Sequence, residues 1–213
     1  MTAIAERLAQ FRAAIPPSVT LVAVSKTQPA NAIREAYAAG QRDFGENYAQ
    51  EWRTKAEELA DLPDLVWHFI GGLQTNKAKY LAGAVRWIHT VDRVELAREL
   101  SKRCEQRGAS VRVLLEVNVS REPQKAGCAP EDAARLADEV RALPALELRG
   151  LMCIPPAEGD PRPHFAALRA LREQLALSDL SMGMSGDWRE AIEEGSTIVR
   201  IGTAIFGARP PTR

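Results

Sequence analysis

The chain has 213 residues and a mass of 23.4 kDa, and its 28 Lys and Arg residues balance its 28 Asp and Glu residues to a formal net charge of zero. Nucleic-acid-binding proteins concentrate positive charge, and here neither the total nor any run of basic residues supplies it. Hydrophobic residues make up 46% and charged residues 26%, which excludes disordered and fibrous classes. No apolar run approaches the roughly 18 residues that a membrane-spanning helix needs. We therefore expect neither a nucleic acid nor a membrane as partner.

The cysteines and histidines do not form a recognisable framework. Cys104, Cys128 and Cys153 are too few and too scattered for a set of disulfides, and we interpret them as reduced thiols of a cytoplasmic protein. The histidines are His68, His89 and His164. Because their spacing is not that of metal ligands, we expect no zinc site.

The first predicted element is an amphipathic helix with apolar residues at Ile4, Leu8, Phe11 and Ile15, and it ends at Pro16-Pro17. Short apolar segments then alternate with helical patterns along the rest of the chain. The predicted strands are Thr20–Ser25, Asp43–Asn47, Val66–Gly71, Trp87–Val91, Val111–Val119, Leu146–Ile154, Leu180–Ser185 and Thr197–Phe206. The helices predicted between them cover about 29–39, 48–60, 74–81, 94–104, 130–143, 162–176 and 187–194.

Eight strand-helix units joined by short links predict a single closed (β/α)₈ barrel, a TIM barrel of the α/β class, preceded by an extra N-terminal helix. The chain is shorter than the roughly 250 residues typical of such barrels. An open doubly wound sheet is the alternative, but the chain has no Gly-x-Gly-x-x-Gly turn and no Walker sequence. The weakest seam runs from Ala157 to Pro163, and we predict one domain over residues 1–213.

Functional groups of such barrels gather at the carboxyl ends of the strands, and the first predicted strand ends in Val24-Ser25-Lys26-Thr27. Partial burial there would lower the pKa of the lysine and make its neutral amine available to form a Schiff base. For Lys26 taken alone, a side chain whose charged end reaches solvent at the rim is the alternative.

The last two predicted strands bring glycine and hydroxyl residues to the same mouth. One leads into Met184-Ser185-Gly186 before a helix predicted from Asp187, and the other contains Arg200-Ile201-Gly202-Thr203. In these barrels the loops after the seventh and eighth strands often hold phosphate, because backbone N–H groups and hydroxyls converge there. For Gly202, a tight turn or close packing is the structural alternative. A lysine facing a phosphate cradle is the layout that a pyridoxal 5′-phosphate (PLP) site needs.

Six motifs follow one another over nearly the whole chain. They are AVSKTQP at 23–29, FGENY at 44–48, HFIGGLQTNK at 68–77, RGLM at 149–152, LSMGMSGDW at 180–188 and VRIGTAIFGAR at 199–209. In this order they resemble the pyridoxal phosphate homeostasis protein family. The resemblance implies a barrel similar to the N-terminal domain of alanine racemase, with PLP held on Lys26 as an internal aldimine. It further implies that the phosphate is held by Ser185, Gly202 and Thr203, that Arg200 faces the pyridine nitrogen, and that Asn47 lines the ring pocket.

The position implied for Arg200 has a chemical consequence. A guanidinium stays protonated, so it disfavours a second positive charge on the pyridine nitrogen and weakens the ring as an electron sink. The alternative for Arg200 is an ion pair with a carboxylate inside the barrel.

The resemblance implies a carrier of the cofactor. Alanine racemases have a second, β-rich domain that supplies a tyrosine acid/base, whereas this sequence ends ten residues after Thr203. We therefore expect a non-catalytic protein that buffers PLP, hands it to PLP-dependent apoenzymes and maintains vitamin B6 and amino-acid pools. A low-activity amino-acid racemase using Lys26 as base, or a Schiff-base aldolase without cofactor, are the alternatives. We expect a monomer, because the short barrel has no added dimerisation domain.

Three positions depart from the common pattern of the family. Gln28 stands where many members have a second lysine, Gly186 replaces an acid, and Gly72 occupies a place that is usually bulkier. Gln28 puts in question any transfer step that relies on that second amine. Candidates for a secondary contact with the cofactor or with phosphate are Lys77, Lys79 and Lys125, for each of which a solvated surface charge is the alternative.

Overall fold

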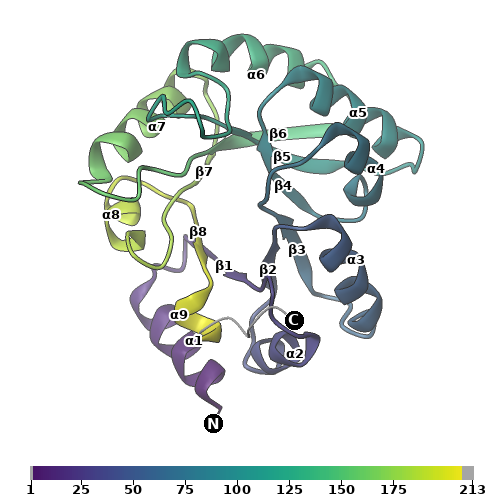
Figure 1. Cartoon of the computed structure of the whole chain (residues 1–213), viewed down its shortest axis with the longest axis vertical. Helices are drawn as coiled ribbons and strands as arrows, with labels where there is room; N and C mark the ends of the chain where they lie inside the picture. Colours follow the sequence, from purple (N-terminus) through teal and green to yellow (C-terminus); the bar gives the residue numbers. More distant parts are fainter. Residues whose placement is uncertain (1, 208–213) are drawn as a thin grey trace.

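The computed structural model describes residues 2–207, in which a ring of helices surrounds a closed barrel of parallel strands (Figure 1). The strands β1 to β8 are Thr20–Val24, Asp43–Glu46, Val66–Phe69, Trp87–Val91, Val111–Glu116, Leu146–Met152, Asp179–Ser181 and Ile198–Ile201. The helices α1 to α9 are Ala3–Ala14, Ala30–Ala38, Ala49–Glu58, Ala78–Leu81, Val94–Glu105, Ala133–Arg141, Arg162–Gln174, Trp188–Glu193 and Thr203–Phe206. Two 3₁₀ helices, η1 and η2, are Thr75–Lys77 and Pro130–Asp132. The prediction of a TIM barrel with an extra N-terminal helix is confirmed. Residues 1 and 208–213 of the predicted domain lie outside the described residues.

The order of the strands brings distant segments to one mouth of the barrel. Each strand pairs in parallel with the next one, and β8 closes the barrel against β1, with Thr20 opposite Ile198 and Ala23 opposite Ile201. Because all the strands are parallel, their carboxyl ends meet at the same end of the barrel. Lys26, just after β1, therefore lies near Gly202, just after β8.

The apolar side chains form two separate layers. The larger cluster lies between the strands and the helices and includes Phe44, Phe69 and Phe165. A smaller cluster draws one residue from each of five strands, and it consists of Val22, Trp87, Leu114, Met152 and Ile198. Side chains from so many strands can meet only on the barrel axis, so this cluster lies in the interior of the barrel.

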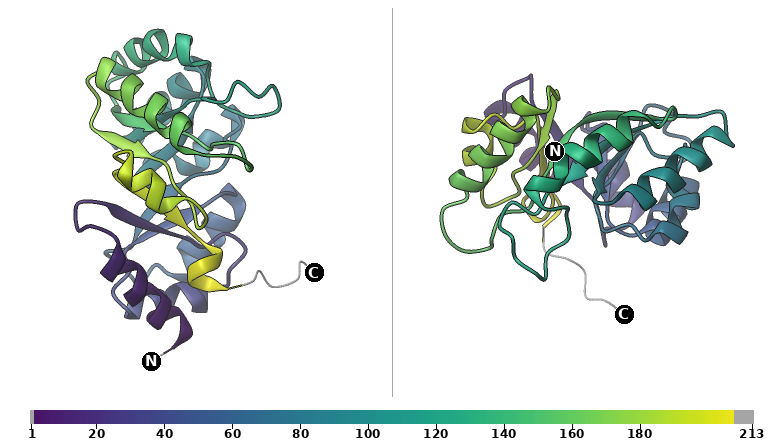
Figure 2. Two further views of the ribbon diagram at one scale, coloured as in Figure 1. Left: turned by 90° about the vertical axis from the view of Figure 1, so that its left-hand side faces the viewer. Right: turned by 90° about the horizontal axis from the view of Figure 1, so that it is seen from above.

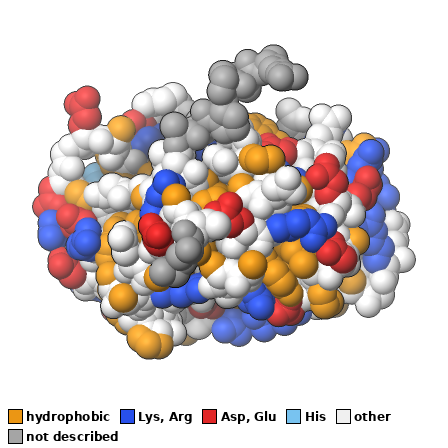
Figure 3. All heavy atoms as spheres, turned by 90° about the horizontal axis from the view of Figure 1, so that it is seen from below, with side chains coloured by type: hydrophobic (Ala, Val, Ile, Leu, Met, Phe, Trp, Pro, Cys, Tyr) orange, Lys and Arg blue, Asp and Glu red, His pale blue; other side chains and the backbone are white. Residues whose placement is uncertain are grey.

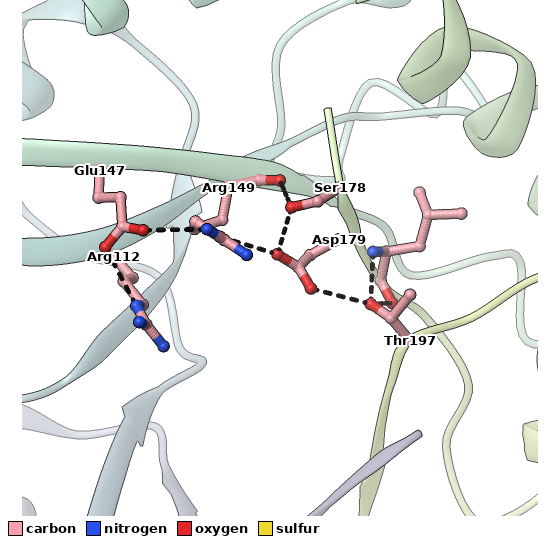
Figure 4. A network of polar contacts seen from close by, with 7 residues as sticks. Arg112, Glu147, Arg149, Ser178, Asp179 and Thr197 are labelled. Atoms are coloured by element: carbon pink, nitrogen blue, oxygen red, sulfur yellow. Dashed lines mark hydrogen bonds and ion pairs between the residues drawn. The ribbon is translucent and has the colours of Figure 1, made fainter. Parts of the chain in front are cut away.

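A polar network joins the amino ends of β5 to β8 (Figure 4). Arg149 donates to Glu147 at 3.0 Å and to Asp179 at 3.1 Å, while Arg112 donates to the other oxygen of Glu147 at 3.1 Å. Thr197 Oγ1 donates to Asp179 at 3.4 Å. These contacts tie four strands together at the end of the barrel opposite Lys26. In this fold that end contributes to stability, whereas functional residues lie at the carboxyl ends of the strands.

The eighth predicted strand, 197–206, is too long. The strand ends at Ile201, and the apolar run after it forms α9, which packs beside α1 near the start of the chain (Figure 2). Arg7 on α1 donates to the carbonyl oxygen of Ile205 at 2.9 Å. A short buried apolar run fits a strand or a helix equally well, and here the contact with α1 decides between them. The predicted helices 74–81 and 130–143 each begin with a 3₁₀ turn, η1 and η2.

The surface agrees with the balanced composition. On the face shown in Figure 3, basic and acidic side chains lie side by side among apolar atoms. Within residues 2–207, no helix is long and apolar enough to span a bilayer.

Candidate cofactor site

A cavity of about 170 Å³ opens at the carboxyl ends of the strands. It is lined by all the residues predicted to bind PLP, namely Lys26, Asn47, Ser185, Arg200, Gly202 and Thr203. Its remaining lining side chains are apolar and belong to Val24, Ile70, Ile154 and Met184. The fold thus brings together the residues singled out in four distant motifs, while the role of each one stays a prediction.

Lys26 lies in a tight turn that follows β1. The amide of Gln28 donates to the carbonyl of Ser25 at 3.0 Å, which closes the turn around Lys26 and Thr27. Thr27 has a φ of 63°, a left-handed conformation that is costly for a β-branched residue. Such a conformation persists only where the surroundings fix it, and here it directly follows the half-buried Lys26.

Three charged side chains hold the backbone on both sides of Lys26. Lys55 on α3 donates at 2.7 Å to each of three acceptors, the carbonyl of Ser25, Glu46 Oε1 and Glu51 Oε1. Ser25 Oγ donates to Glu46 Oε1 at 2.6 Å, and the amide of Thr27 donates to Glu51 Oε1 at 2.5 Å. We call Glu46, Glu51 and Lys55 the turn clamp, because together they bind the residue before and the residue after Lys26.

Two members of the turn clamp, Glu46 and Lys55, are buried, whereas the side chain of Glu51 is 24% exposed. The side chain of Glu46 is 0% exposed and that of Lys55 is 7% exposed. Burial raises the pKa of Glu46, while the charge and the hydrogen bond of Lys55 oppose the rise. The second oxygen, Glu46 Oε2, is buried without a hydrogen-bond partner among the described residues. Removing the ammonium group would therefore leave a buried carboxylate without its main compensation.

Arg200 is buried on the inner side of the cavity, and only 4% of its surface is exposed. Its Nη1 donates to the carbonyl of Ser181 at 2.7 Å and to Ser181 Oγ at 2.6 Å, and its Nη2 donates to the carbonyl of Cys153 at 3.0 Å. Among residues 2–207, the acceptors of these bonds are two backbone carbonyls and one hydroxyl, and none is a carboxylate. On β5, burial raises the pKa of Glu116 to about 7; the charge of Asp92 adds to the rise and that of Arg200 opposes it.

The proposed phosphate end consists of two loops. Ser185 is exposed on the loop after β7, where the amide of Met184 donates to Asp187 Oδ1 at 2.6 Å. At Gly202 a Cβ atom would lie 3.2 Å from the carbonyl oxygen of Val24, so a glycine allows β8 and β1 to approach closely here. The hydroxyls of Ser185 and Thr203 and the backbone at Gly202 are donors suited to a phosphate group.

Asn47 provides an independent indication of a bound ligand. Its Oδ1 is buried and has no hydrogen-bond partner among the described residues. The backbone here is tightly fixed, because a Cβ atom on Gly71 would lie 2.2 Å from the carbonyl oxygen of Asn47. Buried polar atoms without a partner are rare, and a ligand in the cavity would satisfy this one. Asn47, the amine of Lys26, the guanidinium of Arg200 and the hydroxyls of Ser185 and Thr203 line one cavity. This set of polar groups fits a phosphorylated aldehyde with a ring nitrogen.

The residues proposed for secondary contacts are placed apart from this cavity. Lys77 lines a neighbouring cavity of about 250 Å³ together with Tyr48 and Tyr80, and the two cavities share Asn47. Lys125 forms an ion pair with Glu122 at 2.6 Å.

Lys79 is exposed, which agrees with the alternative of a solvated surface charge. Gln28, which stands in place of a second lysine, is 9% exposed and lines a small cavity beside Lys26. At Gly72 and Gly186 an added Cβ atom would meet nothing within 4 Å, so both positions have room for a larger residue.

Sequence reasoning missed the turn clamp and the interior histidines. The spacing of Glu51 and Lys55 is that of a helical ion pair and could have suggested the contact, but nothing in the spacing shows that the pair is buried. His68 and His89 show no metal-ligand spacing, yet their rings are hydrogen-bonded at 2.9 Å because they lie on the neighbouring strands β3 and β4. Within the described part of the chain, no cluster of side chains is suited to a metal ion.

Comparison with known proteins first defines the class. The family described as "Alanine racemase, N-terminal domain" matches residues 1–210. An alanine racemase from Clostridium difficile shares this fold, with a TM-score of 0.76 at 12% identity, and the match covers 98% of this chain and 57% of that one. The chain is thus a barrel of the alanine racemase N-terminal type.

The more similar proteins define the particular family. Pyridoxal phosphate homeostasis proteins of Pseudomonas aeruginosa and Escherichia coli K12 are 52% and 43% identical to the chain, covering 98% of it and 97% and 98% of their own lengths. The structure of PipY from Synechococcus elongatus with PLP bound has a TM-score of 0.90 at 46% identity, and the match covers 96% of this chain and 100% of that one. The chain belongs to the pyridoxal phosphate homeostasis protein family, as the motifs predicted.

Proposed function

We propose that this protein binds PLP in the cavity at the mouth of the barrel, carries and buffers it, and thereby maintains vitamin B6 and amino-acid homeostasis. The observation that carries the proposal is the convergence of Lys26, Arg200 and the Ser185 and Thr203 loops on a single cavity. The cofactor supplies an aldehyde that an amine can capture reversibly as a Schiff base, and a phosphate that can be anchored.

The residues of the chain have separate roles in this proposal. Lys26 provides the amine, and the turn clamp fixes the backbone from which that amine extends. Ser185, Gly202 and Thr203 bind the phosphate through hydroxyl and backbone donors. Arg200 donates to the pyridine nitrogen and keeps it unprotonated, which reduces the capacity of the bound ring to stabilise a carbanion.

The same arrangement favours storage over turnover. Racemisation requires a proton donor or acceptor on each side of the substrate carbon. Among the described residues that line the cavity, the titratable side chains are Lys26 and Arg200, and Tyr48 and Tyr80 line the neighbouring cavity instead. We propose that the protein passes PLP to PLP-dependent apoenzymes in the cytoplasm and acts as a single-domain monomer over residues 1–213.

Borohydride reduction of the PLP-loaded protein, followed by peptide mass mapping, tests the site. We expect the phosphopyridoxyl group on Lys26 and its loss in Lys26→Ala, together with the visible absorbance of the bound cofactor. Lys77→Ala is the matched control, since Lys77 lines the adjoining cavity, and it should retain the label on Lys26. A label found only on another lysine would reject the site, and a protein that shows no absorbance with PLP would favour the cofactor-free aldolase.

A second measurement separates the carrier from a racemase. Incubation of the loaded protein with a panel of amino acids in deuterated water reports exchange at the α-carbon. We expect no exchange at enzyme-like rates, whereas rapid exchange that is abolished in Lys26→Ala would establish catalysis.

Light scattering on the purified protein gives the oligomeric state, and a mass near 23.4 kDa is expected for the monomer.

A further inference from the structure

A continuous chain of hydrogen-bonded side chains runs through the interior of the barrel and ends at Arg200. Arg200 Nη1 donates to Ser181 Oγ at 2.6 Å, and Ser181 Oγ lies 2.9 Å from His89 Nδ1. His89 Nε2 lies 2.9 Å from His68 Nδ1, and His68 Nε2 lies 3.0 Å from Asp43 Oδ1. Five side chains from five different strands therefore form one uninterrupted path.

This path connects the two ends of the barrel. Arg200 lines the cavity at the carboxyl ends of the strands, whereas Asp43 is the first residue of β2 and lies at the opposite end. Ser181 and His89 are 0% exposed and His68 is 1% exposed, while the side chain of Asp43 is 31% exposed. Of the five groups, Asp43 alone has substantial contact with solvent.

The groups at the two ends determine the direction of every hydrogen bond between them. A guanidinium can only donate, so Ser181 Oγ accepts from Arg200 and gives its own proton to His89 Nδ1. His89 is then neutral with its proton on Nε2, and it donates to His68 Nδ1. His68 in turn carries its proton on Nε2 and donates to the carboxylate of Asp43.

The opposite direction fails at both ends. If His89 donated from Nδ1, Ser181 would accept two bonds and its hydroxyl proton would need another partner. His68 would then present a lone pair to the Asp43 carboxylate, which requires a protonated Asp43 or a cationic His68. Burial lowers the pKa of both histidines, which disfavours the cation. Trp87 stacks on the His68 ring with an angle of 7° between the planes, which holds that ring in place.

We propose that Asp43, His68, His89 and Ser181 form a positioning relay that fixes Arg200 for its contact with the cofactor. The inference rests on the proposed function, in which Arg200 faces the pyridine nitrogen. In a buried chain whose donors all point the same way, each bond polarises the next, so the charge of Asp43 strengthens the hold of Ser181 on Arg200. Without that hold, two backbone carbonyls would position the guanidinium, those of Ser181 and Cys153.

The relay itself is tested without any cofactor. Two-dimensional ¹⁵N–¹H spectra of the imidazoles in the cofactor-free protein report which nitrogen carries the proton. We expect both His68 and His89 to be neutral with the proton on Nε2 from pH 5 to pH 8. A proton on Nδ1 of either ring, or an imidazolium in this range, would overturn the relay. This result stands whether or not the protein binds PLP.

The connection to the cofactor is tested by a substitution at the far end. Asp43→Ala removes the final acceptor, and we expect PLP release to accelerate about threefold to tenfold, which corresponds to the loss of one net hydrogen bond, together with a shifted visible absorption band. Asp43→Asn keeps an acceptor for His68 but removes the charge, so we expect it to accelerate release less than Asp43→Ala does. Asp179→Ala is the matched control, because Asp179 is likewise the first residue of its strand but is bonded to Arg149 instead of the relay.

The possible outcomes separate the two proposals. Equal release rates and spectra for Asp43→Ala and Asp179→Ala would overturn the relay while the proposed function stands. If wild-type protein fails to take up PLP, the proposed function is wrong, and the imidazole spectra still decide whether the relay exists. If Asp43→Ala does not fold, Asp43→Asn provides the comparison, with a smaller acceleration expected and unchanged release overturning the coupling.

Discussion

Replacing Lys55 by methionine removes the ammonium group at the centre of the turn clamp. Methionine matches the aliphatic stem of lysine in volume, so the substitution deletes a charge without opening a large cavity. Glu46 loses the cation at 2.7 Å, and the carbonyl of Ser25 loses its donor at 2.7 Å. Because the Glu46 carboxylate is 0% exposed, water does not replace the lost partner.

The size of the effect follows from this burial. Breaking a buried ion pair by removing one partner typically costs about 3–5 kcal/mol, because the remaining charge stays buried without compensation. We expect Lys55→Met to lower the free energy of unfolding at pH 7 by about that amount. Loosening of the Ser25–Thr27 turn should also weaken PLP binding, since the backbone on both sides of Lys26 loses its anchor.

Urea unfolding of Lys55→Met and of the wild type at several pH values measures the effect. Burial already raises the pKa of Glu46 and Lys55 opposes the rise, so without Lys55 the pKa of Glu46 rises further. A carboxyl group with a raised pKa in the folded state favours folding at low pH, and this contribution is lost as the pH rises through that pKa. The deficit of Lys55→Met should therefore be greatest near pH 8 and should shrink as the pH falls towards 5.

Two further variants serve as controls for Lys55→Met. Arg53 lies on the same helix and forms an exposed ion pair with Glu57 at 3.6 Å, so Arg53→Met should cost no more than about 0.5 kcal/mol. Adding Glu46→Gln to Lys55→Met removes the uncompensated charge and should recover part of the lost stability. A cost below about 1 kcal/mol, or one that does not change with pH, would refute the argument from the buried carboxylate.

Two further predictions concern Gly71, which packs against the backbone of Asn47, and Glu116, whose pKa the charge of Arg200 influences. Gly71→Ala should lower the free energy of unfolding by about 1–3 kcal/mol and weaken PLP binding, because the new Cβ would lie 2.2 Å from the carbonyl oxygen of Asn47. In Gly72→Ala the new Cβ would have nothing within 4 Å, so its free energy of unfolding should stay within about 0.5 kcal/mol of the wild type. Equal destabilisation by the two substitutions would reject the steric explanation. Because burial raises the pKa of Glu116 to about 7, its contribution to stability should be lost as the pH rises from about 4.5 to 7. Glu116→Gln should therefore be more stable than the wild type at pH 8, by an amount on the order of 3 kcal/mol, and similar to it at pH 4, as measured by urea unfolding.

The barrel could be predicted from local patterns because a parallel strand buried on both faces is a short apolar run, and each run here is followed by a helical period. The same logic failed at 197–206, where the apolar run continues beyond the strand into α9. Local preference does not distinguish a strand from a helix there. The packing of α9 against α1, which is about 190 residues away along the chain, favours the helix.

The predicted cofactor residues could be found because each belongs to a motif at the carboxyl end of a strand. Lys26, Gly202 and Ser185 were identified by residue type and position, and all three line the same cavity. The family was likewise recognisable from motifs in the sequence, and the comparisons confirm it.

The sequence by itself determined the class of fold, the family and six of the residues that line the cavity, because strand periodicity and strand-end motifs are local properties. The tertiary structure decided how those residues are held. Lys55 is an ordinary helical lysine until α3 buries it against Glu46, and His89 has no partner in its own segment but meets Ser181, 92 positions away. Burial and the meeting of distant strands arise only when the barrel closes, and they turn ordinary charged and polar residues into the turn clamp and the relay.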